Sequence, residues 1–207
     1  MSRYLRVSEV FESIQGEGKF TGHPALFIRL YGCSRVCSFC DTMYSVRGGK
    51  YTAMSVEEVA DAVRRSNQGL VVWTGGEPLL QRDLIVGVVG LTRDKQHHLE
   101  TNGDLLQDVD FSIFDYLAIS PKTLETADRV VQLLRKYPRD KYDVKVVTDL
   151  RVNLDLIPFA TTLQPLTTGD RERDLQVMRN VWAYCVANGK RFSPRIHYLV
   201  FGLERGV

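Results

Sequence analysis

Short apolar runs alternate along the chain with segments whose apolar residues recur at helical spacing. Each run has four to eight residues, is rich in β-branched or aromatic side chains, and is bounded by Gly, Pro, Asn or Asp, a pattern typical of strands. The strands predicted in this way cover residues 25–31, 70–74, 97–100, 116–120, 142–147, 161–164 and 195–200.

Helical segments lie between these runs. Ser55 and Glu58 have the spacing of a capping box, and the apolar stripe of a helix follows them. Residues 124–136 and 172–187 show the same periodicity, and Gly189 marks the end of the second of these helices. The buried face of that helix is expected to hold Leu175, Met178, Val181, Trp182 and Cys185.

Strands that alternate with helices predict an α/β fold with mostly parallel strands. Crossovers between parallel strands are right-handed, and the sheet is either open or curled into a partial barrel. Ligands of such sheets bind outside the carboxyl ends of the strands. The loops that follow the predicted strands are therefore where we expect the functional residues.

Length and composition fit one domain of this kind over residues 1–207. The chain is 44% hydrophobic and 25% charged, which excludes a wholly disordered, collagen-like or coiled-coil protein. The net charge of +2 gives no electrostatic reason to expect direct nucleic-acid or membrane binding. No secretory signal and no apolar run near the ~20 residues of a membrane span is visible. We expect a cytoplasmic protein whose thiols stay reduced.

Three of the four cysteines, Cys33, Cys37 and Cys40, follow the first predicted strand with the spacing C-x3-C-x2-C. Cysteine thiolates hold iron–sulfur clusters. Three ligands would leave one iron of a [4Fe-4S] cluster open to a small molecule such as S-adenosylmethionine (SAM). The alternative is a zinc site, whose fourth ligand would come from His23, His97, His98, His197 or Cys185. Cys185 by itself is expected to be a buried core residue.

The cysteine spacing, with Phe39 before the third cysteine, resembles the signature of the radical SAM superfamily. Thr74 is followed by Gly75-Gly76-Glu77-Pro78, which resembles the superfamily motif whose backbone and carboxylate bind the amino group of SAM. Paired glycines would let the backbone approach a ligand closely. The resemblance implies a partial, open (β/α)6-type radical SAM barrel.

A longer stretch resembles one family within that superfamily. Residues 11–22 and 24–30 are similar to the 7-carboxy-7-deazaguanine synthases, and the similarity continues through the segments 40–42, 100–103, 120–122 and 164–165. Enzymes of this family are lyases of queuosine and 7-deazapurine biosynthesis. The resemblance implies conversion of 6-carboxy-5,6,7,8-tetrahydropterin to 7-carboxy-7-deazaguanine with loss of ammonia. It also implies a Mg2+-dependent ring contraction that a 5′-deoxyadenosyl radical starts.

The resemblance implies a role for each matching residue. Cys33, Cys37 and Cys40 would hold the [4Fe-4S] cluster, and Thr42, otherwise a residue that caps a turn, would bind Mg2+. The implied SAM-binding residues are Phe39, Cys40, Asp41, Gly76, Glu77, Ser120, Pro121 and Lys122. The implied substrate-binding residues are Ile14, Gln15, Gly16, Glu17, Arg29, Thr74 and His197.

Arg29 is informative without any resemblance. The pleat of the first predicted strand puts Phe27, Arg29 and Tyr31 on one face. An arginine in an apolar strand is costly unless it is paired. It therefore forms either a structural salt bridge or a clamp for a substrate carboxylate, which a planar guanidinium suits. The resemblance implies the clamp.

The ends of the chain and its partners complete the prediction. Residues 1–24 are expected to form a substrate loop, and residues 194–207 are expected to close the site. The chain continues past His197 to Val207, so it is open whether Val207 reaches the substrate. Asn102 stands where the family has a smaller residue. The resemblance implies a homodimer and a flavodoxin-like or ferredoxin-like electron donor.

Two other functions fit parts of the sequence. A glycyl-radical-enzyme activase would share the cysteine loop but would need neither the Gln15-Gly16-Glu17-Gly18 segment nor Thr42. A zinc-stabilised binding module without catalysis would use the cysteines for structure alone.

Overall fold

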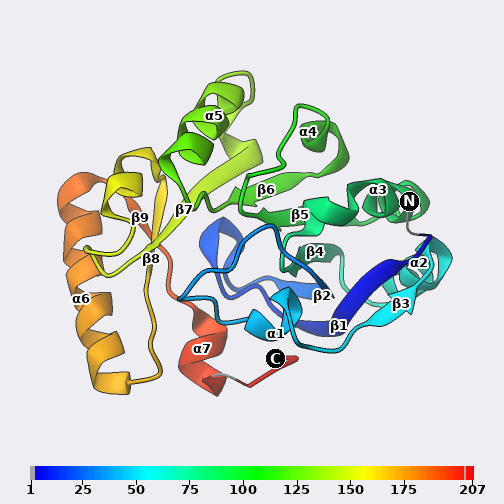
Figure 1. The fold of residues 1–207 in the computed structure, drawn as a ribbon, viewed down its shortest axis with the longest axis horizontal. Helices are drawn as coiled ribbons and strands as arrows, with labels where there is room; N and C mark the ends of the chain where they lie inside the picture. Colours follow the sequence, from blue (N-terminus) through cyan, green and yellow to red (C-terminus); the bar gives the residue numbers. More distant parts are fainter. Residues whose placement is uncertain (1–2, 203) are drawn as a thin grey trace.

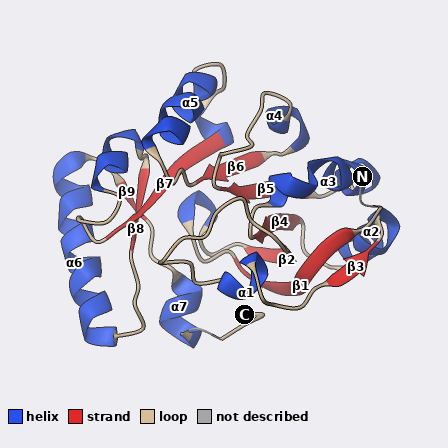
Figure 2. Ribbon diagram, in the orientation of Figure 1, coloured by secondary structure: helices blue, strands red, loops and turns tan. Residues whose placement is uncertain are grey.

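The strands form one open sheet in the computed structural model, which describes residues 3–202 and 204–207. The strand order is β3-β1-β2-β4-β5-β6-β7-β8-β9 (Figures 1 and 2). Neighbours from β2 to β9 are parallel, and β1 is antiparallel to both β2 and β3. The predicted α/β fold with a mostly parallel, unclosed sheet is therefore confirmed.

Six of the seven predicted strands correspond to observed strands, each within one residue at either end. These are β2 (Pro24–Leu30), β4 (Leu70–Gly75), β5 (Gln96–Thr101), β6 (Tyr116–Ile119), β7 (Tyr142–Thr148) and β8 (Thr162–Pro165). The remaining strands are β1 (Leu5–Ile14), β3 (Thr52–Met54) and β9 (Arg191–Phe192).

Helices connect the parallel strands. They are α1 (Met43–Val46), α2 (Val56–Arg65), α3 (Arg82–Leu91), α4 (Asp110–Ile113), α5 (Leu124–Leu134), α6 (Arg171–Asn188) and α7 (Ile196–Phe201). Short 3-10 turns are η1 (Gly18–Phe20), η2 (Pro78–Gln81), η3 (Arg139–Lys141) and η4 (Leu154–Phe159). The capping box is confirmed, since Ser55 and Glu58 exchange side-chain and backbone hydrogen bonds. Among the described residues, no helix is long and apolar enough to cross a membrane.

The face predicted for α6 is only partly correct. Val181 and Cys185 are buried, but Trp182 is 59% exposed and Leu175 is also exposed. The helix packs on the short strands β8 and β9 at one end of the sheet, where a narrow surface is available. Only part of the apolar stripe can therefore be covered.

The predicted strand at residues 195–200 is wrong, because these residues form helix α7. Its β-branched and aromatic residues suggested a strand, but the sheet already ends at β9. After Pro194 the chain turns back to the cavity mouth, and the amide of Ile196 donates to the Gly16 carbonyl at 3.0 Å. Tertiary contacts thus override the local propensity.

The expected N-terminal substrate loop is also shorter than predicted. Strand β1 occupies residues 5–14, and the loop is confined to residues 15–23. Residues 1, 2 and 203 of the two predicted terminal segments lie outside the described residues. The sequence pattern did not predict β1, because the second half of this strand contains polar residues and alternates half-buried and exposed positions.

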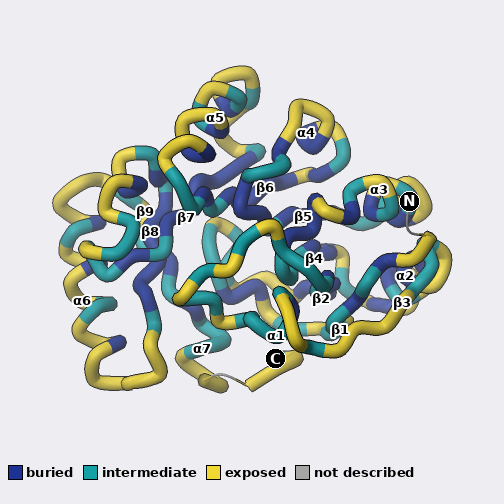
Figure 3. The backbone as a smooth tube through the Cα atoms, in the orientation of Figure 1, coloured by how far each residue is buried: buried dark blue, intermediate teal, exposed yellow. Residues whose placement is uncertain are grey.

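Two large apolar clusters support the sheet, and a third, small one joins Ala25, Leu70 and Val72 on β2 and β4. The larger one joins β1–β7 with α2, α3 and α5, and fully buried Trp73 and Leu117 belong to it. The smaller of the two large clusters lies between η4, β8 and α6 and contains Cys185, as predicted. Figure 3 shows buried strands at the centre and exposed helix faces at the rim. The opposite side of the sheet, where Figure 1 shows α1, α7 and the C-terminus together, is left for the site.

Candidate active site

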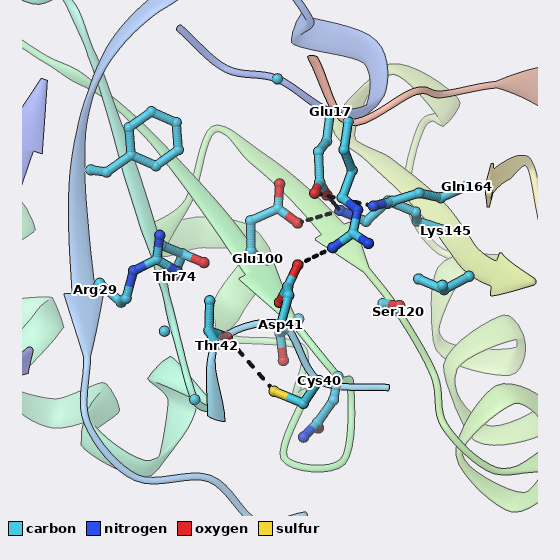
Figure 4. Close-up of a pocket in the computed structure, with 18 of the residues that line it drawn as sticks. Glu17, Arg29, Cys40, Asp41, Thr42, Thr74, Glu100, Ser120, Lys145 and Gln164 are labelled. Carbon is cyan, nitrogen blue, oxygen red and sulfur yellow. Dashed lines mark hydrogen bonds and ion pairs between the residues drawn. The ribbon is translucent and has the colours of Figure 1, made fainter. Parts of the chain in front are cut away.

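The carboxyl ends of the parallel strands open onto a cavity of about 250 Å3. Its walls come from β1, from β2 and β4–β8, from the cysteine loop (residues 32–42), and from α7 and Val207. Figure 4 shows Arg29 and Thr74 on one side and Lys145 and Gln164 on the other, in the order of their strands. The site thus lies where parallel-sheet topology predicted it.

Most of the predicted site residues line this one cavity. They are Ile14, Gln15, Gly16, Glu17, Arg29, Cys33, Cys37, Phe39, Cys40, Asp41, Thr42, Thr74, Gly76, Ser120, Lys122 and His197. The exceptions are Glu77 and Pro121, which are buried and do not reach the cavity. Val207 also lines the cavity.

The cysteine loop presents three free thiols at the cavity. Cys33 Sγ accepts hydrogen bonds from the Arg35 amide at 3.4 Å and from Asn102 Nδ2 at 3.9 Å. Donors of this kind surround the sulfurs of iron–sulfur clusters and tune their potentials. Burial raises the pKa of the Cys33 thiol. Three thiols on one loop, with N–H donors to one of them, fit a cluster held by three cysteines.

A clasp at the edge of the cavity holds the first half of the cysteine loop, and Arg35 and Asn102 of this clasp line the cavity. The Arg35 guanidinium binds both carboxylate oxygens of Asp104, with N–O distances of 2.5 and 2.8 Å. Asp104 also accepts from the hydroxyls of Ser34 and Thr126. Asn102 adds a bond from Nδ2 to Ser34 Oγ at 3.0 Å. The unexpected Asn102 is thus accommodated, and it ties the β5 loop to the cysteine loop.

The geometry does not favour a zinc site. Within residues 3–202 and 204–207, no three His, Cys, Asp or Glu side chains converge closely enough to hold a single metal ion. Of the candidate fourth ligands only His197 lines the cavity. His97 is bound to Trp73 and Thr92 inside the core, and His98 packs on Phe20. Cys185 is buried in the smaller apolar cluster.

The Gly-Gly-Glu-Pro segment packs closely against its neighbours, and Gly75 and Gly76 also line the cavity. A Cβ on Gly75 or Gly76 would lie about 2.0–2.1 Å from the carbonyl oxygen of Leu30 or Gly32. The glycines therefore let the end of β4 press against the base of the cysteine loop. The Glu77 carboxylate accepts hydrogen bonds from Leu79 N, Thr101 Oγ1 and Asn102 N, and burial raises its pKa to about 7.

A buried cation organises the far side of the cavity. Lys145 Nζ pairs with Glu17 and, at 2.9 Å, with Glu100 Oε2. Gln15 donates to the other oxygen of Glu100, and Gln164 donates to Glu17 Oε1 at 3.1 Å. Burial opposes ionisation of Glu17, but Lys145 and nearby cations outweigh it and hold its pKa at about 2. Burial raises the pKa of Glu100, the second carboxylate on the same cation.

The loop that contains Glu17 is docked on the C-terminal segment. A Cβ on Gly16 would lie 2.5 Å from His197 Nδ1, so only glycine allows this approach. Gly18 N donates to Ser193 Oγ at 2.7 Å. Burial lowers the pKa of His197, which keeps the imidazole neutral near pH 7. His197 therefore faces the cavity from a helix and not from a strand.

Arg195 connects this segment to the cysteine loop. Its guanidinium binds Asp41 and Thr167, and the residue is only 6% exposed. Lys122 Nζ donates to Ser120 Oγ at 2.7 Å and lies 5.7 Å from the centre of the Phe39 ring, which belongs to the cysteine loop. Both halves of the cysteine loop are therefore held by contacts distant in sequence.

Sequence reasoning missed Lys145, Arg195 and Asp104. Lys145 could have been found, because it interrupts the apolar strand β7 as Arg29 interrupts β2. The partners of Arg195 and Asp104 are 154 and 69 residues away, so no local pattern reveals them. Lys145 differs from Arg195 and Asp104 because the apolar residues next to it in sequence already indicate that its charge is buried.

Comparisons with known proteins agree with this geometry. A family model described as the radical SAM superfamily matches residues 27–150. A curated 7-carboxy-7-deazaguanine synthase from Thermoplasma acidophilum is 32% identical and covers 98% of this chain and 100% of that protein. One from Hyperthermus butylicus is 35% identical over 97% of this chain and 94% of that protein. The crystal structure of QueE from Escherichia coli shares the fold, with a TM-score of 0.60, 20% identity, and 93% and 94% of the two chains covered.

Proposed function

Because the chain belongs to the 7-carboxy-7-deazaguanine synthase family of the radical SAM superfamily, we propose that it is a lyase that converts 6-carboxy-5,6,7,8-tetrahydropterin to 7-carboxy-7-deazaguanine with loss of ammonia. One observation carries the proposal: a three-cysteine loop and a row of polar strand ends share one cavity. In this arrangement a source of radicals and a polar heterocycle would bind at adjacent sites.

Cys33, Cys37 and Cys40 are the residues that would hold the [4Fe-4S] cluster. When bound, a reduced cluster and SAM supply a 5′-deoxyadenosyl radical, and the hard chemistry belongs to these cofactors. Phe39, Asp41 and the Ser120–Lys122 pair would hold SAM beside them. The Arg35–Asp104 clasp and the Arg195–Asp41 contact support this role, because they fix both halves of the loop. The protein's share of catalysis is to position the reacting carbon and exclude water.

The pterin would bind between Arg29 and Lys145. Gln15 and Glu17 offer amide and carboxylate groups that match the donors and acceptors along a pterin edge. Glu17 stays ionised because Lys145 holds its pKa at about 2. The Arg29 guanidinium would bind the substrate carboxylate, while Thr74 and neutral His197 contact the ring. Ile14 and Gly16 complete this side of the cavity.

Thr42 would bind Mg2+ together with substrate oxygens and water. Its hydroxyl lines the cavity 3.7 Å from Cys40 Sγ. Mg2+ usually keeps several waters and takes few protein ligands, so a single hydroxyl is a sufficient protein contribution. When bound, the ion would polarise the substrate oxygens and would help Thr42 to orient the ring that contracts.

Family membership argues against the two other functions. A glycyl-radical-enzyme activase leaves the docked Gln15–Gly18 segment without a purpose, and a zinc module leaves the polar strand ends around the cavity without a purpose. We further propose that the protein works in the cytoplasm as a homodimer with a flavodoxin-like or ferredoxin-like electron donor. We propose no direct contact with nucleic acid or a membrane.

An anaerobic turnover assay tests the proposed function. Protein reconstituted with iron and sulfide should be brown, contain about four irons and give a reduced-cluster EPR signal that changes with SAM. With 6-carboxytetrahydropterin, SAM, reductant and Mg2+ it should release 7-carboxy-7-deazaguanine and ammonia. Loss of ammonia leaves the oxidation state of the pterin skeleton unchanged, so many turnovers should be obtained for each SAM consumed. A Cys37→Ala variant is the control and should do none of this. Cleavage of SAM without any deazaguanine product would exclude the proposed substrate.

A further inference from the structure

Arg29 Nε is held by side chains to which the proposed function assigns no role. Arg29 Nε donates to Glu9 Oε2 at 2.8 Å, and the same oxygen accepts a hydrogen bond from the Tyr44 hydroxyl at 2.8 Å. The Arg205 guanidinium carbon lies 3.8 Å from the centre of the Tyr44 ring. Strands β1 and β2, helix α1 and the C-terminal segment therefore meet around one arginine.

A β-bulge brings Glu9 to this position. In the β1–β2 ladder Val7 pairs with Leu30 while Glu9 pairs with Arg29, so β1 has one extra residue between them. If the register of the Val7–Leu30 pair continued without a bulge, Glu9 would pair with Ile28, and its side chain would lie on the other face of the sheet from Arg29. The bulge is thus the feature that puts the carboxylate beside the guanidinium.

Glu9 and Tyr44 can affect a ligand only through Arg29. Arg29 lines the cavity, whereas Glu9 and Tyr44 do not. The Tyr44 hydroxyl is the donor and the Glu9 carboxylate oxygen is the acceptor of their hydrogen bond. Hydrogen bonds to an ionised carboxylate are stronger than neutral ones, so this contact restrains the side chains well.

The other edge of Arg29 is available to a ligand. Among the described residues, no hydrogen bond or ion pair engages its two terminal nitrogens. The Phe11 ring, whose centre is 5.4 Å from the guanidinium carbon, covers one flat face. Phe11 is itself stacked on Phe27. A guanidinium fixed at Nε and on one face presents a planar fork that matches the two oxygens of a carboxylate.

We propose that Glu9 and Tyr44 are positioning residues that orient Arg29 and thereby set the preference for a pterin bearing a carboxylate at C6. This inference rests on the proposed function. Arg205 is the outermost member of the network and holds the Tyr44 ring. The role of Glu9 is to fix the fork, and this gain in order outweighs its repulsion of the substrate carboxylate because Glu9 contacts only the Nε edge.

Equilibrium binding to the SAM-loaded holoenzyme, without turnover, tests the inference. The ligands are 6-carboxytetrahydropterin and tetrahydropterin, which lacks the carboxylate. Glu9→Gln should weaken binding of the carboxylated ligand about tenfold, and Tyr44→Phe about threefold, the ranges expected for charged and neutral hydrogen bonds. Binding of tetrahydropterin should not change. Tyr51→Phe, a change at an exposed tyrosine for which no contact with Glu9 is seen, is the matched control.

A double variant shows whether the effect passes through Arg29. Glu9→Gln added to Arg29→Gln should weaken binding no further than Arg29→Gln alone. Unchanged or tighter binding of the carboxylated ligand by Glu9→Gln and Tyr44→Phe would overturn the inference, as would equal losses for both ligands. Wild-type enzyme that turns over the pterin separates this failure from that of the proposed function. Wild-type enzyme that neither binds nor turns it over would refute both.

Discussion

Two cations inside otherwise apolar strands mark the two sides of the cavity. Arg29 interrupts β2 near its carboxyl end, and Lys145 interrupts β7 at its middle. The two cations differ in their ion-pair partners. Arg29 has one carboxylate at its Nε edge, whereas Lys145 is shared by Glu17 and Glu100. The terminal nitrogens of Arg29 are available to an anion. The two carboxylates around Lys145 outnumber this one cation, so they can accept hydrogen bonds from donor groups of a ligand.

Replacing Lys145 tests how much this cation stabilises the two buried carboxylates. Lys145→Met leaves Glu17 and Glu100 buried beside each other without a counter-ion. We expect a loss of roughly 3–5 kcal/mol in the free energy of unfolding, as when one partner of a buried ion pair is removed. Urea unfolding measures it. Lys145→Arg, which keeps the charge, should lose much less, and equal losses in the two variants would argue against an electrostatic cause.

The hydroxyl of Thr42 can be tested separately from its shape. Thr42→Val keeps the volume but removes the proposed Mg2+ ligand, so turnover should lose its response to Mg2+ and fall on the order of tenfold or more. Thr42→Ser should retain the response. The measurement is turnover as a function of Mg2+ concentration. A Val variant with a wild-type Mg2+ dependence would remove Thr42 from the metal site.

At the scale of elements, contacts from two distant parts of the chain hold the cysteine loop. Arg35 lies between the first two cysteines, and its bidentate partner Asp104 follows β5 and also binds α5 through Thr126. Arg195 from the segment before α7 binds Asp41 at the other end of the loop. A loop restrained at both ends loses less conformational freedom when its thiols take up iron.

Loosening one end should therefore speed the loss of iron. Asp104→Asn removes the ion pair with Arg35 but keeps the size of the side chain. We expect iron release to a chelator to accelerate about tenfold, the change that corresponds to one charge-assisted bond. Asp108→Asn breaks a solvent-exposed ion pair with Lys136 and is the control. Equal release rates in the two variants would show that the clasp does not protect the cluster.

The elements also show what a sequence can predict and what it cannot. Six strands were predicted to within one residue, because buried parallel strands are short apolar runs with clear breaks. Strand β1 and helix α7 were not, since both lie beside the cavity and their conformation depends on partners far along the chain. Ile196 is held by Gly16, and Glu9 reaches Arg29 only through a bulge. The same holds for Asp104 and Arg195, whose partners no local pattern indicates.

At the scale of the whole molecule, buried carboxylates of two kinds shape the dependence of stability on pH. Lys145 holds the pKa of Glu17 at about 2, against an ordinary value of 4.5. A lowered pKa contributes stability that is present above pH ~4.5 and is lost as the pH falls toward 2. Burial raises the pKa of Glu77 to about 7. A native state that binds more protons than the unfolded chain loses stability as the pH rises from ~4.5 to 7.

The two effects together predict a maximum in the free energy of unfolding near pH 5. Urea unfolding between pH 3 and 8 should show a fall on the acid side, which Lys145→Met should diminish. The fall between pH 5 and 7 should disappear in Glu77→Gln. That variant should also be less stable at pH 5, because its amide nitrogen meets the donor Asn102 N–H. If Glu77→Gln keeps the wild-type slope above pH 5, Glu77 ionises normally inside the fold and the buried carboxylate needs another explanation.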